Sequence, residues 1–492
     1  MISVVKNKKY FFYSSKIPLE NKLKIKKTEN FNEKKFETSI PGSKSITNRA
    51  LVLSALNSIS VTLSGFLFAE DTYWGLVMLE ILGFEIQCDF EKFNVTITPP
   101  QKKNIQKKDL ELYLGKSGTL ARFFPAVILN FQKTFPWSEL FTSKFDGDPQ
   151  LKKRPISEFI DAVEKLNGKI FSKSYPLEIQ PSDLQGKCEI SGKTSGQFLS
   201  GLLLAAYGSR NSIFIQRKDY LVQPDYIRIT LKMIEEFGGK INYDSKLTEF
   251  SIDKQSQQYN KLPEYNIEAD ASTVCYFVTL AVIHNFNFVV NNLGYKTLQP
   301  DFEFISILKQ IGADINIFED KINVNKIEKS DNLVNKSNFL NSLFKGNNKE
   351  TLRLNFSKMS DQALTIGILA LILNFSLEIY GVEHIRFHEC DRIQCFVQNC
   401  RELGFLVTEN KDGFLIAHQE KGIEKMGSQK DALDKEKKGI WKTHHDHRFG
   451  MCGALLASVF HEIEIENPQC VEKTCPQFFE ILNQLGFQHY GA

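Results

Sequence analysis

The stretch Leu231–Ile241 (LKMIEEFGGKI) carries the pattern that decides the fold of this chain. Its apolar residues recur three and four positions apart, as on one face of a helix, and glycine then precedes a short alternating segment. Glycine just after the last helical turn readily adopts the left-handed conformation that ends many helices. The stretch therefore predicts a helix, a glycine stop and a strand.

The same pattern occurs in five further places along the chain. They are Leu76–Ile86, Phe159–Ile170, Phe304–Ile315, Phe396–Val407 and Phe478–Gln488. The closing glycines, Gly83, Gly168, Gly238, Gly312, Gly404 and Gly486, are 70 to 92 residues apart. This spacing predicts six repeated α/β units, three before about residue 266 and three after it. The polar segment Ser256–Pro263 is a plausible crossing between the halves, and Lys326–Lys349 and Glu420–Lys438 are expected to be surface loops.

Composition narrows the class of protein. The chain has 492 residues, of which 42% are hydrophobic and 24% charged, and its net charge of +3 does not favour a nucleic-acid-binding protein. No apolar run is long enough to span a membrane. The nine cysteines include no C-x-x-C pair, so we expect reduced thiols in a cytoplasmic protein. Met1–Lys16 is basic but lacks the apolar core of a secretory signal, and its role stays open.

The segment Pro41–Leu51 (PGSKSITNRAL) predicts a helix start with Ser43 or Ser45 as its cap. Helix N-termini attract anions, and here Lys44 lies beside the cap while Ser45 and Arg49 share one helix face. An ordinary capped helix with solvated basic residues explains the segment about equally well. It is not a phosphate-binding P-loop, because serine rather than glycine precedes Lys44.

Cations recur near expected helix starts in several of the repeats. They are Lys44, Arg49, Arg122 (in LGKSGTLAR, which also holds Gly118), Arg154, Arg392, Arg448 and Lys473. If each half gathers its helix N-termini at one end, these cations converge on a multiply anionic ligand. Ser195 and Gln197 offer further hydrogen bonds to such a ligand.

Two carboxylates and a histidine-rich stretch complete the candidate chemistry. Asp361 and Glu389 are candidates for acid–base work, although Asp361 is equally readable as a helix cap. The stretch His444–Arg448 (HHDHR) does not have the histidine spacing of a zinc site, so no metal is expected there.

These motifs, taken in order, resemble the 5-enolpyruvylshikimate-3-phosphate (EPSP) synthase family. The matching segments are PGSKSITNRAL, LGKSGTLAR, KKRP, SGQFLS, EADAS, DQALT, HECDR, DHR and CVEKTCP, which run from Pro41 to near Gly486. The resemblance implies an α/β (α+β) fold of two similar domains, each with three βαβαββ repeats in an inverse α/β barrel-like arrangement. It implies one domain from residues 1–41 plus 267–492, a second from 42–266, and an active site in the interdomain cleft.

The resemblance also implies a reaction and a set of roles. The enolpyruvyl group of phosphoenolpyruvate would pass to the 5-hydroxyl of shikimate 3-phosphate through a tetrahedral intermediate, without metal or cofactor, in a cytoplasmic monomer. Residues matching the phosphoenolpyruvate site are Lys44, Gly118, Arg122, Arg154, Arg392, Arg448 and Lys473. Those matching the shikimate 3-phosphate site are Lys44, Ser45, Arg49, Ser195, Gln197, Asp361 and His388. Asp361, Glu389 and Lys44 would be catalytic, with Asp361 as the base and Glu389 handling the proton on the vinyl carbon.

The chain departs from the family pattern at two positions, and two other functions compete. Lys116 replaces the usual asparagine, and His388 replaces the lysine before Glu389. The first competitor is the sister transferase acting on UDP-N-acetylglucosamine, which normally has a cysteine in the loop corresponding to Phe141–Pro155, where this chain has none. The second is a non-catalytic anion-binding scaffold.

Overall fold

The computed structural model describes residues 20–28, 34–101, 109–136, 141–193, 195–253, 262–327, 351–418 and 437–491. Within these ranges the chain divides into two compact units. Unit 1 contains Pro41–Glu268, and unit 2 contains Ala269 onward together with the N-terminal stretch that ends at Ile40. Most of the predicted crossing and most of both expected surface loops lie outside the described residues.

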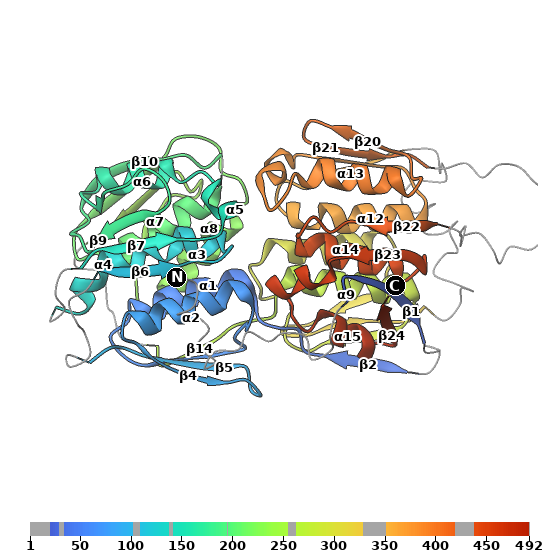
Figure 1. Cartoon of the computed structure of the whole chain (residues 1–492), viewed down its shortest axis with the longest axis horizontal. Coiled ribbons are helices and arrows are strands. Elements are labelled where there is room, and N and C mark those ends of the chain that lie inside the picture. Colours follow the sequence, from blue (N-terminus) through green and yellow to red (C-terminus); the bar gives the residue numbers. More distant parts are fainter. Residues whose placement is uncertain are drawn as a thin grey trace, which may run out of the picture. The chain divides into compact units, whose positions relative to one another are not determined.

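Unit 1 alternates helices with short strands (Figure 1). Its helices are α1 (Lys44–Ala55), α2 (Glu70–Ile81), α3 (Gly118–Phe123), α4 (Pro125–Thr134), α5 (Pro149–Lys152), α6 (Ser157–Lys165), α7 (Gly196–Gly208) and α8 (Asp225–Glu236). Its strands are β3 (Val61–Ser64), β4 (Glu85–Asp89), β5 (Asn94–Thr98), β6 (Leu110–Tyr113), β7 (Ser143–Asp146), β8 (Lys169–Ile170), β9 (Leu177–Gln180), β10 (Gly186–Ile190), β11 (Ile213–Arg217), β12 (Asn242–Tyr243), β13 (Glu249–Ile252) and β14 (Glu264–Asn266).

Unit 2 repeats this alternation. Its helices are α9 (Ala271–His284), α10 (Glu303–Gln310), α12 (Ala363–Leu373), α13 (Arg392–Glu402), α14 (His447–Ala457) and α15 (Phe478–Gln484), with short 3-10 turns η3 (Pro300–Phe302), η4 (Ser360–Gln362), η5 (Glu383–Phe387) and η6 (Pro468–Lys473). Its strands are β1 (Lys22–Lys27), β2 (Lys35–Thr38), β15 (Asn287–Val290), β16 (Ile315–Ile317), β17 (Ile322–Val324), β18 (Leu352–Asn355), β19 (Leu377–Tyr380), β20 (Val407–Asn410), β21 (Gly413–Ile416), β22 (Lys438–Trp441), β23 (Glu462–Glu466) and β24 (Phe487–Gly491). The α/β class predicted from the sequence is confirmed.

The strands form six four-stranded sheets, three in each unit, built on one plan. In each, a parallel pair is extended by two antiparallel strands; β6 pairs parallel to β7, which is followed by β9 and β8. In four of the sheets a helical crossover joins the two parallel strands, as a parallel connection requires; these pairs are β6–β7, β10–β11, β18–β19 and β22–β23. These sheets agree with the βαβαββ unit that the family resemblance implies.

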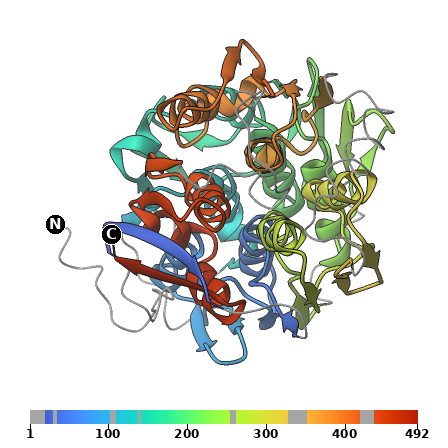
Figure 2. The same cartoon turned by 90° about the vertical axis from the view of Figure 1, so that its right-hand side faces the viewer.

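Strands distant in sequence complete three of these sheets. β1 lies between β23 and β24 and pairs antiparallel with both; Figure 2 shows the blue and red strands side by side. β2 precedes α1 in the chain but pairs parallel with β15 of unit 2. Conversely, β14 precedes α9 but pairs parallel with β3 of unit 1. The chain therefore exchanges one strand at each of the two crossings, Ile40–Pro41 and Glu268–Ala269, that lie within the described ranges.

The predicted glycine stops hold at five of the six positions. Gly83, Gly238, Gly312, Gly404 and Gly486 have positive φ angles between 77° and 101°. The prediction for Gly168 is wrong, because Asn167 takes the left-handed conformation there with a φ of 62°. Asparagine tolerates this region better than other residues with a side chain. A Cβ at Gly168 would meet Val163 Cγ1 at 2.2 Å, so glycine is needed there for space.

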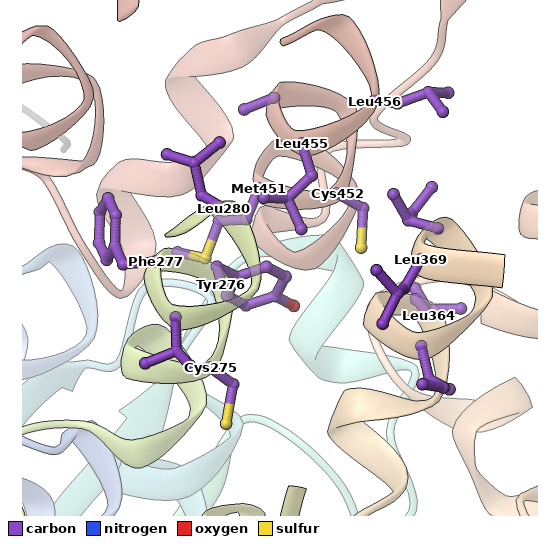
Figure 3. Packing of buried hydrophobic residues seen from close by; sticks show 14 of the residues in the cluster. Cys275, Tyr276, Phe277, Leu280, Leu364, Leu369, Met451, Cys452, Leu455 and Leu456 are labelled. Carbon is purple, nitrogen blue, oxygen red and sulfur yellow. The ribbon is translucent and has the colours of Figure 1, made fainter. Parts of the chain in front are cut away.

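The core of unit 2 is formed by α9, α12 and α14, which pack against one another (Figure 3). All eleven residues of α12 are buried, which fits a helix that is apolar on every side. Figure 3 shows Tyr276 and Leu280 from α9 beside Met451 and Cys452 from α14, with Leu364 and Leu369 from α12. Because these helices are buried, their packing fixes the positions of the polar residues at their N-termini.

Candidate active site

Arg392 is the centre of a charged cluster in unit 2. It is the first residue of α13 and only 2% exposed. Its Nη1 donates to Asp361 Oδ1 at 2.9 Å, its Nη2 to Glu389 Oε2 at 2.9 Å, and its Nε to Asp446 Oδ2 at 2.8 Å. Burial alone would lower the pKa of Arg392, but the three carboxylates raise it above its ordinary value. Arg392 therefore stays cationic and fixes three carboxylates around one guanidinium.

Two further cations share these carboxylates. Arg448, in the first turn of α14, donates from Nη2 to Asp361 Oδ2 at 2.5 Å. Lys473, at the end of η6, donates from Nζ to Glu389 Oε1 at 2.7 Å. Asp361 and Glu389 each therefore contact two cations, one through each oxygen. The structure brings together five residues that the sequence analysis took from four separate motifs.

Asp361 does not cap a helix. It lies in η4 just before α12, and both of its carboxylate oxygens face arginines. Of the two readings left open by the sequence, the structure favours the charged site over the cap.

His388, one of the two departures from the family pattern, joins the same cluster. Its Nδ1 lies 3.0 Å from Arg392 Nη1, and arginine can only donate, so Nδ1 must be the unprotonated nitrogen. Burial, and then the charge of Arg392, lower the pKa of His388 to about 3. The histidine is therefore a neutral hydrogen-bond acceptor at this position, where a lysine would be a second cation.

A buried polar network behind Asp361 was not found from the sequence. Asp301 accepts hydrogen bonds from Ser272 Oγ and, at 3.3 Å, from Gln362 Nε2. Ser272 Oγ in turn lies 3.3 Å from Arg448 Nη2. Burial, and then the charge of Asp361, raise the pKa of Asp301 to about 6. Asp301 thus stands one hydroxyl away from the arginine that holds Asp361.

Unit 1 holds a second group of cations, arranged around Gly118. Arg122 Nη1 donates to the carbonyl oxygen of Gly118 at 2.6 Å, within helix α3. A Cβ at Gly118 would lie 2.1 Å from Arg154 Nη1 and 2.9 Å from Arg122 Nη1. The absence of a side chain at Gly118 is therefore what allows both guanidinium groups to approach this turn. Arg154 Nε and Nη2 are buried and have no hydrogen-bond partner among the described residues.

The start of α7 lies against this group. Ser195 caps α7 by accepting a hydrogen bond from the amide of Gln197 at 3.2 Å. Gln197 Nε2 lies 3.5 Å from the hydroxyl of Thr119, the neighbour of Gly118. The guanidinium of Arg122 lies over the ring of Phe198, 4.9 Å from its centroid. Four of the predicted residues, Gly118, Arg122, Arg154 and Gln197, are thus gathered in unit 1.

Lys44, Ser45 and Arg49 lie in α1. Lys44 Nζ lies 3.7 Å from Asp71 Oδ2. Arg49 is 2% exposed, and its guanidinium donates to the hydroxyls of Thr230 and Ser200 and to two carbonyl oxygens, one of them that of Ser45. Burial lowers the pKa of Arg49 to about 10, which still leaves it charged at neutral pH. Arg49 therefore ties α1 to α7 and α8 in this structure, and its predicted contact with a ligand stays a prediction.

One smaller expectation from the sequence, the serine cap of α1, is corrected. Ser43 is the residue at the cap position of α1, but its side chain makes no capping hydrogen bond there, and neither does Ser45 occupy the cap. Lys116, the other departure from the family pattern, lies with its ammonium 4.0 Å from Asp148 and its side chain 46% exposed. Lys116 is thus a surface residue in this structure.

Three acidic residues of the two clusters were not proposed from the sequence. Asp446 lies in the DHR motif, which was a usable signal, but Asp71 and Asp301 stand in no motif that marks them. Each has a side-chain partner 27 or more positions away along the chain, as for Lys44 with Asp71 and Arg392 with Asp446. Within the described ranges no group of three histidine, cysteine, aspartate or glutamate side chains is placed to hold a metal ion. Nor does any helix in the described part have the length and apolar character needed to cross a membrane.

Comparisons with known proteins identify the family of the chain. The family model described as EPSP synthase (3-phosphoshikimate 1-carboxyvinyltransferase) matches residues 32–482. A protein of Halalkalibacterium halodurans named 3-phosphoshikimate 1-carboxyvinyltransferase 2 is 31% identical over 92% of each chain. One of Sulfurovum sp. named 3-phosphoshikimate 1-carboxyvinyltransferase is 30% identical over 91% of this chain and 96% of its own.

The fold agrees as well. The chain is similar to a solved structure of EPSP synthase from Acinetobacter baumannii, with a TM-score of 0.71 and 20% sequence identity. The match covers 96% of this chain and 100% of the solved chain. At that identity the structure supports the fold, whereas the family match and the relatives support the activity. From its repeats, its charged cluster and these matches, the chain belongs to the EPSP synthase (3-phosphoshikimate 1-carboxyvinyltransferase) family.

Proposed function

We propose that this protein transfers the carboxyvinyl group of phosphoenolpyruvate to the 5-hydroxyl of shikimate 3-phosphate and releases phosphate. The observation that carries the proposal is the pairing of Asp361 and Glu389 with Arg392, Arg448 and Lys473. Two carboxylates held by shared cations supply groups that can move protons, while the cations can stabilise the charge of anionic substrates and of an intermediate.

The two carboxylates divide the proton transfers. Asp361 takes the proton of the 5-hydroxyl as that oxygen attacks the central carbon of phosphoenolpyruvate. Glu389 exchanges the proton of the vinyl carbon, which becomes a methyl group on addition and loses a proton again as phosphate leaves. Two cations within 2.9 Å favour the carboxylate form of Glu389, so it begins as a base. For the addition step it must first receive a proton, and Lys473 Nζ, at 2.7 Å, is within reach.

The remaining cations and polar groups bind the substrates. We assign phosphoenolpyruvate to Lys44, Gly118, Arg122, Arg154, Arg392, Arg448 and Lys473, and shikimate 3-phosphate to Lys44, Ser45, Arg49, Ser195, Gln197, Asp361 and His388. The unpartnered nitrogens of Arg154 support this assignment, because buried guanidinium groups ordinarily find acceptors. Three expectations from the sequence stay predictions. They are that the ligands bind between the two halves, that the protein is a monomer, and that it is cytoplasmic.

Calorimetric titration of the full chain with shikimate 3-phosphate and, separately, with UDP-N-acetylglucosamine tests the function. We expect binding of the first and none of the second; the reverse result would favour the sister transferase. Turnover with phosphoenolpyruvate, followed as phosphate release, then separates an enzyme from a non-catalytic scaffold.

A matched pair of lysine variants shows whether the cluster is responsible. Lys473→Met removes a cation paired to Glu389, whereas Lys442→Met removes a lysine paired to Glu402 at 2.9 Å outside the cluster. We expect the first to lose turnover and the second to keep it. Equal losses would show that the cluster is not the site.

A further inference from the structure

A buried serine and a buried aspartate lie behind Arg448, and the proposed reaction gives neither of them a role. Ser272 is the second residue of α9, and Asp301 lies in η3, just before α10. Ser272 is 8% exposed and Asp301 is 1% exposed. The hydroxyl of Ser272 contacts both neighbours, because it donates to Asp301 Oδ2 and lies 3.3 Å from Arg448 Nη2. The two residues therefore give Arg448 a second contact in addition to Asp361.

The direction of these hydrogen bonds follows from the chemistry of the three groups. Arginine can only donate, so Ser272 Oγ accepts from Arg448 Nη2 through a lone pair. With a pKa of about 6, Asp301 is ionised at neutral pH, and an ionised carboxylate can only accept. The single hydrogen of the Ser272 hydroxyl is therefore directed to Asp301 Oδ2. Asp301 thus fixes the rotation of the hydroxyl so that a lone pair faces the arginine.

The contact with Ser272 completes the hydrogen bonding of one guanidinium nitrogen. Nη2 of Arg448 carries two hydrogens. It donates to Asp361 Oδ2 at 2.5 Å and to Ser272 Oγ at 3.3 Å, which accounts for both. Because the guanidinium group is planar and rigid, fixing these two directions fixes the plane of the whole group. Ser272 therefore helps to set the directions in which Arg448 can donate its remaining N–H groups to a ligand.

Asp301 is held firmly in place although its burial is costly. Gln362 Nε2 donates to Asp301 Oδ2 at 3.3 Å and to the carbonyl oxygen of Ser272 at 3.4 Å, and Thr365 Oγ1 donates to Gln362 Oε1 at 2.9 Å. Asp301 Oδ1, however, is buried without a hydrogen-bond partner among the described residues. Buried polar atoms are ordinarily hydrogen-bonded, so this oxygen destabilises the folded state. Such local costs are typical of functional sites.

We propose that Ser272 and Asp301 are positioning residues for the transferase reaction: Ser272, with its hydroxyl fixed by Asp301, holds the guanidinium group of Arg448 in the orientation that binds phosphoenolpyruvate. This inference rests on the proposed function, which assigns Arg448 to phosphoenolpyruvate. Asp361 is held separately, because Arg392 Nη1 donates to its other oxygen at 2.9 Å. Loss of the Ser272 contact should therefore weaken the binding of phosphoenolpyruvate and leave that of shikimate 3-phosphate unchanged.

Ser272→Ala in the full chain tests this selectivity, with Ser458→Ala as the matched control. Ser458 is buried at the other end of α14, where its hydroxyl donates to the carbonyl oxygen of Leu455 at 2.7 Å. In Ser272→Ala we expect the KM for phosphoenolpyruvate to rise about tenfold, as for the loss of one hydrogen bond to a charged group. The dissociation constant for shikimate 3-phosphate, measured by calorimetry without phosphoenolpyruvate, should stay the same. Ser458→Ala should change neither quantity.

Ser272→Thr keeps a hydroxyl at this position, so it should restore the KM for phosphoenolpyruvate. A general disturbance of unit 2 would instead weaken the binding of both substrates. That result, or an unchanged KM in Ser272→Ala, would overturn the inference. Absence of turnover by the original protein would overturn the proposed function together with the inference, whereas turnover with an unchanged KM in the variant would overturn the inference alone.

A double-mutant cycle tests whether Asp301 acts through Ser272. Asp301→Leu removes the acceptor that fixes the hydroxyl, so on its own it should raise the KM for phosphoenolpyruvate. Added to Ser272→Ala it should cause no further rise, because the bridge to Arg448 is already absent. Circular dichroism at the assay temperature verifies that each variant is folded. Rises that multiply in the double variant would show that Asp301 does not act through Ser272, and would overturn its role as a positioning residue.

Discussion

The charged groups of unit 1 and unit 2 differ in how their arginines are held. In unit 2, Arg392 and Arg448 are both buried and paired with carboxylates. In unit 1, Arg49 is equally buried but donates only to hydroxyls and carbonyl oxygens, and within the described residues neither Arg49 nor Arg154 forms an ion pair. An arginine with only neutral partners keeps its positive charge uncompensated, whereas an arginine paired with a carboxylate does not. Unit 1 is thus arranged to attract anions, and unit 2 to hold carboxylates that can exchange protons.

The largest expected effect tests the chemical side of this contrast. Glu389→Gln keeps the shape of the side chain but removes the group assigned to proton exchange, so turnover should fall by about 10²–10⁴-fold. The affinity for shikimate 3-phosphate should change much less. Steady-state kinetics and calorimetry measure the two quantities. Glu402→Gln, which removes the carboxylate paired with Lys442, is the matched control. If Glu389→Gln kept near-normal turnover, Glu389 would be only a structural partner of Arg392.

Stability gives the most direct comparison of the two kinds of buried arginine. Arg392→Met leaves the buried Asp446 without its cation, and breaking a buried ion pair in this way costs about 3–5 kcal/mol. Urea unfolding followed by circular dichroism measures the loss. A cost below that of the Arg49 variant described below would contradict the contrast.

The pH dependence of stability reports on Asp301. Its pKa is about 6 in the folded protein and near 3.8 ordinarily, so the native state binds the proton more tightly than the unfolded chain. This contribution is fully present below about pH 4 and is lost as the pH rises through 6. Asp301→Asn removes the titrating group, so relative to the original protein it should gain on the order of 2–3 kcal/mol between pH 4 and 7. Parallel stability curves for the two proteins would show that Asp301 does not titrate there.

Arg49→Met should cost less than Arg392→Met. Its loss leaves hydroxyls and carbonyl oxygens without a donor, and an unsatisfied buried polar group costs about 1–3 kcal/mol. The same urea unfolding experiment measures it. If Arg49 also contacts shikimate 3-phosphate as proposed, the variant should bind that ligand more weakly at a pH and temperature where it remains folded. Unchanged affinity would restrict Arg49 to its structural role.

The smallest effect is expected at His388. Because its pKa is about 3, the imidazole is neutral between pH 6 and 8 and accepts the hydrogen bond of Arg392 through Nδ1. Glutamine can also accept that hydrogen bond, so His388→Gln should change the dissociation constant for shikimate 3-phosphate by less than about tenfold, or about 1.4 kcal/mol. Its pH profile from 6 to 8 should parallel that of the original protein. Diverging profiles would mean that a bound ligand brings His388 into its titration range.

The sequence by itself determined the repeating architecture. The helix period, the glycine stops and the alternating strands are local features, so six α/β units could be predicted from spacing alone. Local features also placed Lys44 and Arg392 at helix starts. The prediction was less exact where two neighbouring residues could each take the left-handed conformation that ends a helix. At Gly168 that conformation is taken by Asn167 instead.

Only the tertiary structure decided which groups meet. The exchange of β2 and β14 depends on pairing with strands that lie 252 and 202 residues away along the chain. No local pattern encodes such a pairing. The same holds for Asp446 and Asp301, which accept hydrogen bonds from Arg392 and Gln362 of other repeats. Charge states followed from that packing: the neutral form of His388 reflects the burial and the nearby arginine that three-dimensional contact imposes, because pKa values respond to distance in space rather than along the chain.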